Sequence, residues 1–199
     1  MGDNYKKIVE ANLAALYANP ARDLARRLPA SRNGEQFMFA AFGGVCRIEP
    51  QGIFLDDTPQ TGVIGILLSL YALSADPAPC RLEPFKAYKD FPDSMPYTGA
   101  FVSHTEQILV PQVSSLRAAR AGIVKSFNGQ DATVTVAGDF AWVVYPLPKI
   151  ALCYIFYEAD EDFPASATCL FSNNANTFLP MDALADVGEY TSKKILALL

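Results

Sequence analysis

The chain has 199 residues, of which 51% are hydrophobic and 19% are charged. This length and composition are typical of a globular protein with a substantial core, and they exclude a disordered chain. The net charge of -5 argues against nucleic-acid binding, because proteins that bind nucleic acids use a basic face to displace counterions from the phosphates. We expect residues 1–199 to form a single globular domain, within which residues 1–57 are a candidate N-terminal subdomain.

The N-terminal sequence MGDNYKKIVEANLAALYANP mixes charged with apolar residues, which predicts an amphipathic helix and not a secretory signal. Asp3 or Asn4 is expected to cap this helix. Its buried side is predicted to consist of four residues: Ile8, Leu13, Leu16 and Tyr17. A second, short helix is expected to begin at Pro20 and to end before Pro29.

Residues 35–57 predict a β-meander of three short strands, because Gly43-Gly44 and a turn at residues 50–52 interrupt the apolar pattern. Thr61 is expected to cap the following helix. The apolar run of that helix, residues 62–75, is shorter than the roughly 20 residues needed to span a bilayer, so it predicts a buried core helix. We therefore expect a cytoplasmic protein that does not bind membranes.

Residues 78–101, APCRLEPFKAYKDFPDSMPYTGAF, are rich in proline, aromatic and charged residues. We interpret this segment as an ordered irregular loop, because its aromatic side chains need burial and a flexible linker would have few of them. A helical pattern then begins near Gly99. It is expected to kink or split at Pro111 and to end at Asn128-Gly129.

The last third of the chain predicts antiparallel strands. Residues 132–148 are expected to form a hairpin that turns at Gly138-Asp139. Residues 149–157 are apolar on both alternating faces, which is typical of a strand that is covered on both sides. The next strand is predicted at residues 166–171.

A closing helix is predicted to bury Leu184, Val187, Ile195 and Leu198. The elements together predict an α+β fold, in which helices pack on a largely antiparallel sheet. N-terminal helices and a β-meander come first, and C-terminal β-hairpins and the closing helix come last.

Two blocks of the sequence resemble a known family. Residues 66–92, ILLSLYALSADPAPCRLEPFKAYKDFP, combine a leucine-rich helix, a connector and an aromatic loop. Residues 147–184, LPKIALCYIFYEADEDFPASATCLFSNNANTFLPMDAL, combine an apolar strand, an acidic turn with Phe-Pro, a strand ending in Leu-Phe and a helix entered through Leu-Pro. The chain is similar in these blocks to the bacterial and archaeal domain-of-unknown-function family 3786. The resemblance runs through most of the chain and is strongest from Pro146 to Ala183.

The resemblance implies a shared fold and no particular activity. Some members of the family look to be fused to cysteine-rich iron–sulfur segments. This chain has no such segment, so that association is not carried over and the cofactor is unknown. The chain also departs from the family after Leu-Phe, where Ser172 occupies a position that is typically acidic. The resemblance therefore assigns no role to a carboxylate at this position.

The turn after the strand at residues 149–157 carries four carboxylates: Glu158, Asp160, Glu161 and Asp162. With Asn173 they offer the oxygen ligands that hard divalent cations prefer, and Glu158, Asp160 and Asp162 are the candidate metal ligands. The spacing lacks the alternation and the central glycine of an EF-hand. The alternatives are a solvated turn whose charges discourage edge pairing, or a ligand pocket lined by Glu158 at the strand end.

The cysteines are Cys46, Cys80, Cys153 and Cys169, and no two of them form the CxxC pair of a zinc or iron–sulfur site. If the last hairpin is centred near Glu161, Cys153 and Cys169 face each other across it. We interpret these thiols as small buried apolar groups. A redox pair or a soft-metal site would need electropositive neighbours that lower a thiol pKa, and the sequence supplies none nearby.

His104 is the only histidine, and Ser103 precedes it. A Ser-His-Asp arrangement through His104 lacks the GxSxG turn that presents a nucleophilic serine. We therefore interpret His104 as a surface or capping residue near a helix start. Neither GxGxxG nor GxxxxGK[ST] occurs, which argues against dinucleotide binding and P-loop chemistry.

The aromatic side chains of the irregular loop, together with Trp142, either wall a small-molecule pocket or pin the loop to the core. We favour a binding or accessory protein without catalysis of its own. It would bind a small ligand or a protein partner on the surface formed by residues 81–97 and 158–173. The candidate ligand-binding residues are Phe85, Tyr88, Phe91, Tyr97, Glu158 and Asn173.

Two other functions remain open. One is an enzyme of the hydrolase type that uses the carboxylate cluster, with or without a divalent metal. The other is a structural subunit that self-associates through its apolar helix or its strand edges. The sequence identifies no ligand, no partner and no oligomeric state.

Overall fold

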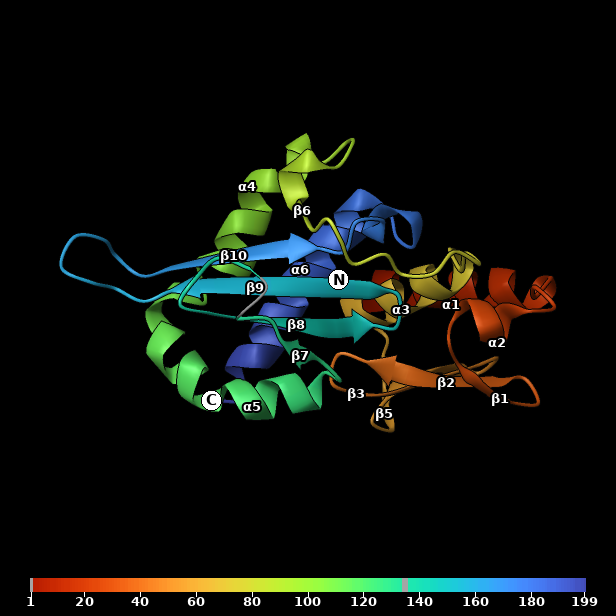
Figure 1. Cartoon of the computed structure of the whole chain (residues 1–199). Helices are drawn as coiled ribbons and strands as arrows, with labels where there is room; N and C mark the ends of the chain where they lie inside the picture. Colours follow the sequence, from red (N-terminus) through yellow and green to blue (C-terminus); the bar gives the residue numbers. More distant parts are fainter. Residues whose placement is uncertain (1, 134–135) are drawn as a thin grey trace.

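The structure is a computed structural model that describes residues 2–133 and 136–199. It is an α+β fold, as the sequence predicts, with helices packed on two antiparallel five-stranded sheets (Figure 1). The helices are α1 Gly2–Ala18, α2 Leu24–Arg27, α3 Val63–Leu73, α4 Thr98–Phe101, α5 Val113–Ser126 and α6 Met181–Leu196. In the described chain none of them has both the length and the apolar character that crossing a membrane requires.

The N-terminal sheet is larger than the predicted three-stranded meander. Its order is β1-β2-β3-β4-β5, and the strands are β1 Ser31–Asn33, β2 Gln36–Ala41, β3 Gly44–Glu49, β4 Gly52–Leu55 and β5 Thr58–Pro59. The two added strands lie at the edges of the sheet and are exposed along their whole length. These two strands could not be predicted from the sequence, because an exposed edge strand lacks the alternation of apolar and polar residues that marks a half-buried strand.

The first helix buries a different set of residues from the one predicted. Leu13 and Leu16 are buried as expected, but Val9 takes the place of Ile8, which is 37% exposed. The predicted caps were also wrong, because α1 begins at Gly2 and includes both capping candidates. Helix α3 is buried as predicted, although Gly62 and not Thr61 is its N-cap.

The C-terminal sheet has the order β6-β10-β9-β8-β7. Its strands are β6 Lys86–Ala87, β7 Gln130–Asp131, β8 Phe140–Leu147, β9 Ile150–Tyr157 and β10 Ser166–Phe171. Strand β9 is buried on both faces along most of its length, as its apolar pattern predicts. Figure 1 shows α6 behind this sheet.

The hairpin predicted at residues 132–148 is only partly correct. Strand β8 pairs with β7, which comes before the predicted first arm. Of that arm, residues 132, 133 and 136–139 are not in a strand, and residues 134–135 lie outside the described residues. Gly138 does mark a turn, because its φ of 122° is a backbone conformation that favours glycine.

The register of the last hairpin differs by one residue from the prediction. Cys169 faces Tyr154, and Cys153 faces Leu170. A shift of one residue moves a side chain to the other face of a sheet. The predicted pairing of Cys153 with Cys169 is therefore wrong, and the two thiols belong to separate apolar clusters.

The helical segment after the irregular loop is split as predicted. A single 3-10 turn at Val110–Gln112 contains Pro111 and precedes α5. Helix α5 ends just before Asn128, whose φ is 51°. Helix α6 buries Leu184, Val187 and Ile195 as expected, but Leu198 lies beyond its end and is 47% exposed.

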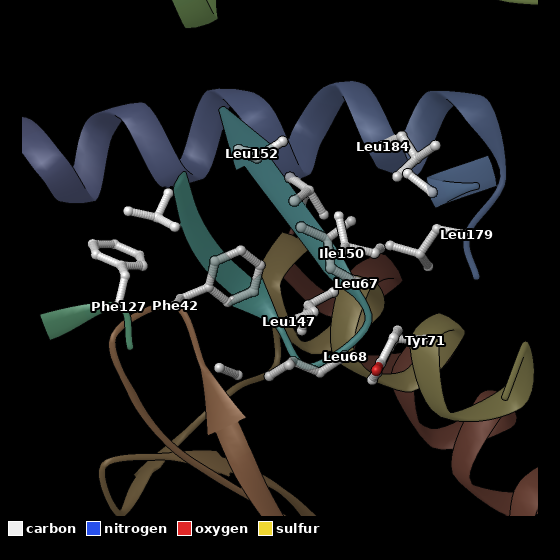
Figure 2. Close-up of a cluster of buried hydrophobic side chains, with 14 of the residues drawn as sticks. Phe42, Leu67, Leu68, Tyr71, Phe127, Leu147, Ile150, Leu152, Leu179 and Leu184 are labelled. Atoms are coloured by element: carbon white, nitrogen blue, oxygen red, sulfur yellow. The ribbon is translucent and has the colours of Figure 1, made fainter. Parts of the chain in front are cut away.

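The main core joins the two sheets. The loop between β2 and β3 carries Phe42, which is buried and whose backbone N–H donates to the carbonyl of Pro146 at 2.7 Å. Figure 2 shows Phe42 next to Phe127, with Leu147 close by, inside a cluster that α6 borders. The N-terminal sheet is thus attached to the C-terminal sheet through buried side chains.

Candidate functional site

The structure separates the aromatic residues that the sequence analysis grouped together. Tyr88 and Phe91 are buried in the main core, and both rings lie near Phe171 of β10. Phe85 is half-buried and packs on the opposite face of the C-terminal sheet, in the cluster that contains Cys153. Tyr97 is exposed.

Asn173 holds the irregular loop in place. Its backbone N–H donates to the carbonyl of Arg81 at 2.7 Å, and its side-chain amide donates to the carbonyl of Pro84 at 2.8 Å. The neighbouring Asn174 is buried and bonds to the backbone of Pro79 and Arg81. These bonds join segments about 90 residues apart, so they fix the path of the loop across the sheet.

Glu158 and Asp160 of the acidic turn have bonding partners within the protein. Glu158 forms an ion pair with Arg117 of α5, and its backbone N–H donates to Asp139 at 2.7 Å. The Asp160 carboxylate accepts hydrogen bonds from the backbone N–H groups of Asp162 and Phe163. Within the described chain, no three His, Cys, Asp or Glu side chains are grouped so that they could hold a metal ion.

The two segments proposed to form one surface lie at opposite ends of β10. Glu158 is near its Ser166 end, and Asn173 follows its Phe171 end. Five residue steps along a strand correspond to roughly 17 Å. Figure 1 shows the β9–β10 turn projecting away from the rest of the molecule. Of the predicted ligand-binding residues, the structure therefore brings Glu158 to one end of the sheet and the others to the opposite half.

One of the predicted residues, Tyr88, lines a pocket of about 250 Å³ at the edge of the C-terminal sheet. We call it the Tyr88 pocket. Its lining residues come from the loop, from α4 with the π-helical segment Val102–Glu106, and from β10: Ala87, Tyr88, Lys89, Thr98, Phe101, Val102, Glu106 and Thr168. The volume is a little below the range of roughly 300–1,000 Å³ that is usual for small-molecule sites.

The wall of the Tyr88 pocket is aromatic and rigid. The rings of Tyr88 and Phe101 are stacked, with centroids 4.6 Å apart and an interplanar angle of 11°. The hydroxyl of Tyr88 donates to the carbonyl of Met181 at 2.6 Å, which fixes the ring from its far end. Both side chains are almost fully buried, so the wall is formed before any ligand arrives.

Glu106 supplies the carboxylate of the Tyr88 pocket. Strand β6 pairs only with Leu170 and Phe171, so the earlier part of the same edge of β10 has no strand neighbour. There the backbone N–H of Cys169 donates to Oε1 of Glu106 at 2.9 Å. Burial raises the pKa of the Glu106 carboxyl above its ordinary value, and the hydrogen bond from Cys169 lowers it by a smaller amount.

The π-helical turn sets the direction of Glu106. The N–H of Gln107 bonds to the carbonyl of Val102, five residues earlier, which widens the turn. The segment lies close to α6, because a Cβ at Gly188 would come within 2.5 Å of the Phe101 ring. Phe101 is thus held by α6, and Glu106, five residues on, reaches β10. Such π-helical turns are frequent at functional sites.

Phe101, Glu106 and Thr168 are not among the site residues that the sequence predicts. Glu106 lies in a mixed polar stretch, SHTEQ, which reads as the exposed face of a helix. A single isolated carboxylate carries no motif. The one feature of the sequence that could have indicated Glu106 is its position at the end of a helical segment that follows the aromatic loop. This position does not distinguish a buried side chain from an exposed one.

The remaining candidates occupy ordinary structural positions. His104 is exposed, and its Nδ1 lies 3.0 Å from Oε2 of Glu189 on α6, in agreement with the interpretation as a surface residue. Ser103 donates to the carbonyl of Gly99. Burial raises the pKa of the Cys153 thiol to about 11 and that of Cys169 well above its usual range, which leaves both thiols protonated and unreactive.

A comparison with protein-family models matches residues 21–194 to the family described as Domain of unknown function (DUF3786). The match covers both sheets and most of the helices, including every residue that lines the Tyr88 pocket. No curated protein and no solved structure matches the chain.

Proposed function

The chain belongs to the DUF3786 family, and we propose that it is a binding protein that holds a small organic molecule in the Tyr88 pocket. The observation that carries this proposal is the combination of a preformed aromatic wall with one half-buried carboxylate at the sheet edge. A mostly apolar pocket with a few directed polar groups is the usual form of a small-molecule site. The volume of about 250 Å³ favours a ligand with one ring or a chain of similar size.

A second hollow near Tyr97 supports ligand binding less well. Its volume is larger, about 540 Å³, but most of the residues that line it are exposed. They include Pro92, Asp93, Pro96, Asn176 and Asp182. A hollow lined by solvated side chains removes little ligand surface from water, so it gains little from the hydrophobic effect.

The proposal is tested by blocking the pocket. Val102→Trp and Thr98→Phe place large side chains on two different parts of its lining. Ser103→Trp is the matched control, because Ser103 is exposed on the same turn and does not line the pocket. Three probes of one size, benzyl alcohol, benzylamine and benzoate, are titrated by ligand-observed NMR against each variant, after thermal unfolding has shown that the variants are folded.

We expect at least one probe to bind wild type and Ser103→Trp, and to bind both pocket-filling variants at least tenfold more weakly. Absence of binding by all three probes would overturn the proposal, and so would equal binding to the filled variants. Native mass spectrometry of freshly purified protein provides an independent measurement. A bound small molecule that is present in wild type and absent from Val102→Trp is the expected result.

A further inference from the structure

We infer that the Tyr88 pocket selects an organic cation, namely a primary amine on a ring-sized apolar body, whose ammonium group pairs with the Glu106 carboxylate. The inference deepens the proposed function and rests on it. The ligand class follows from Glu106, which is the half-buried one of the two charged residues in the lining and would be the residue that determines specificity.

Glu106 lacks a counter-ion within the described part of the chain. Among the described residues its carboxylate has one hydrogen-bond partner, the backbone N–H of Cys169, which uses Oε1. No ion pair joins it to a Lys, Arg or His of the described chain, and no basic side chain contributes to the shift of its pKa. A half-buried carboxylate without a counter-ion keeps part of its desolvation cost, so an arriving cation gains a partner that the described chain does not supply.

Lys89 is the other charged residue of the lining. Lys89 is exposed, so water and salt screen its ammonium group, whereas Glu106 is half-buried. Charge interactions are stronger where the surroundings are apolar, and Glu106 therefore dominates the field that a ligand meets inside the pocket. An anionic ligand would be repelled there, and a neutral one would form no ion pair with the carboxylate.

The aromatic wall lies in the same pocket as the Glu106 carboxylate. Tyr88 and Phe101 both line the pocket that Glu106 lines, and the small parts of their stacked rings that reach the pocket are apolar. An ammonium group that lies near aromatic rings also interacts favourably with their faces. The pocket thus combines a carboxylate with aromatic surface. A ligand with an ammonium group interacts favourably with both, whereas Glu106 repels a ligand with a carboxylate.

The groups around Glu106 allow a test by pH. Tyr88 and Lys89 come from the loop, Cys169 from β10 and Tyr154 from β9, and His104 lies on the same π-helical segment. Burial raises the pKa of Tyr88, Tyr154 and Cys169, so these groups stay neutral across the neutral and acidic range. His104 faces Glu189, on the other side of the segment. Glu106 is the group whose protonation would remove the charge from the pocket.

The experiment compares the three probes on wild type, Glu106→Gln and Glu189→Gln. The glutamine at position 106 keeps an oxygen for the Cys169 N–H and removes the charge. Glu189→Gln removes a carboxylate on α6 that faces His104 and does not line the pocket. We expect benzylamine to bind wild type at least tenfold more tightly than benzyl alcohol, with benzoate the weakest. Glu106→Gln should weaken benzylamine at least tenfold and change benzyl alcohol by less than twofold, and Glu189→Gln should leave both unchanged.

The affinity of wild type for benzylamine should also fall as the pH is lowered, because burial raises the pKa of Glu106 and its carboxylate is therefore protonated at a higher pH than an ordinary carboxyl. Glu106→Gln should show no such fall, and His104→Ala should retain it.

Equal affinity for benzylamine and benzyl alcohol, or no loss in Glu106→Gln, would overturn the inference and leave the proposed function standing, provided that Val102→Trp still blocks binding. Absence of binding by every probe would overturn the proposed function itself. The two failures are therefore distinguishable in one set of titrations.

Discussion

Glu106 shows how one side chain serves the structure and a candidate site together. Its Oε1 satisfies a backbone N–H that the short β6 leaves without a strand partner. A buried N–H without a partner would cost about 1–3 kcal/mol, so the hydrogen bond is by itself a reason for a polar residue here. The hydrogen bond does not require a charged residue, because the oxygen of a neutral amide side chain accepts the same bond. The choice of a carboxylate is what points to a ligand.

The pH dependence of stability follows from the raised pKa of Glu106. A carboxyl whose pKa is higher in the folded than in the unfolded state contributes stability that is fully present below the unfolded value, near pH 4. This contribution is lost as the pH rises through the folded value. We predict that Glu106→Gln gains stability relative to wild type as the pH rises from near 4 through the raised pKa of Glu106. Urea unfolding at several pH values measures the difference.

Glu161→Gln is the control for the loss of one carboxylate, because Glu161 is exposed in the acidic turn. A difference between wild type and Glu106→Gln that stays constant with pH would contradict the prediction. It would mean that the Glu106 carboxylate is solvated in the folded protein.

At the level of the elements, the contact between α6 and the π-helical segment decides where the pocket residues lie. Gly188 of α6 is buried, and a Cβ there would lie 2.5 Å from the Phe101 ring and 3.1 Å from Oγ1 of Thr105. The glycine allows the two helical segments to approach until Phe101 stacks on Tyr88. A larger residue would push the segment away from α6 and disturb the aromatic wall.

We predict opposite effects for the same substitution at two helical glycines. Gly188→Ala should lower stability by about 1–3 kcal/mol, because the added methyl group is forced into a packed contact. Gly122→Ala on α5 should raise it by up to about 1 kcal/mol, since that Cβ would meet open space and alanine favours helix. Thermal unfolding of both variants provides the comparison. Equal stabilisation would show that α6 and the π-helical segment have room between them.

At the level of the whole molecule, Phe42 connects the two sheets. Its φ of 49° is a conformation that bulky residues rarely adopt, and its ring is buried against Tyr190 of α6 with centroids 4.9 Å apart. The turn between β2 and β3 thus inserts an aromatic side chain into the core of the C-terminal half. This contact bears on whether residues 1–57 form a separate subdomain.

We predict that Phe42→Ala destabilises both sheets together, by about 3–5 kcal/mol. Trp142 is the only tryptophan and lies on β8, so its fluorescence reports the C-terminal sheet alone, whereas circular dichroism reports the whole chain. The two urea transitions should coincide in wild type and shift together in the variant. Met38→Ala, at an exposed position of β2, is the control. A Trp142 transition that does not move in Phe42→Ala would indicate an independent N-terminal subdomain.

Several elements could be predicted because their signals are local. The apolar pattern of residues 149–157 and the short run at 166–171 correspond to β9 and β10, and the closing helix corresponds to α6. Pro111 lies at the predicted break before α5. In each case the chain repeats or interrupts a pattern over a few neighbouring residues, and such patterns need no knowledge of the rest of the fold.

The sequence by itself determined the α+β class, the buried helix α3 and the positions of β2, β3, β4, β8, β9 and β10, because these follow from hydrophobic periodicity and from glycine and proline. Tertiary structure decided the register that separates Cys153 from Cys169, since one residue of slip leaves the local pattern unchanged. It also decided the pocket. Glu106 meets the N–H of Cys169 across 63 residues of chain, and only the folded protein half-buries that carboxylate.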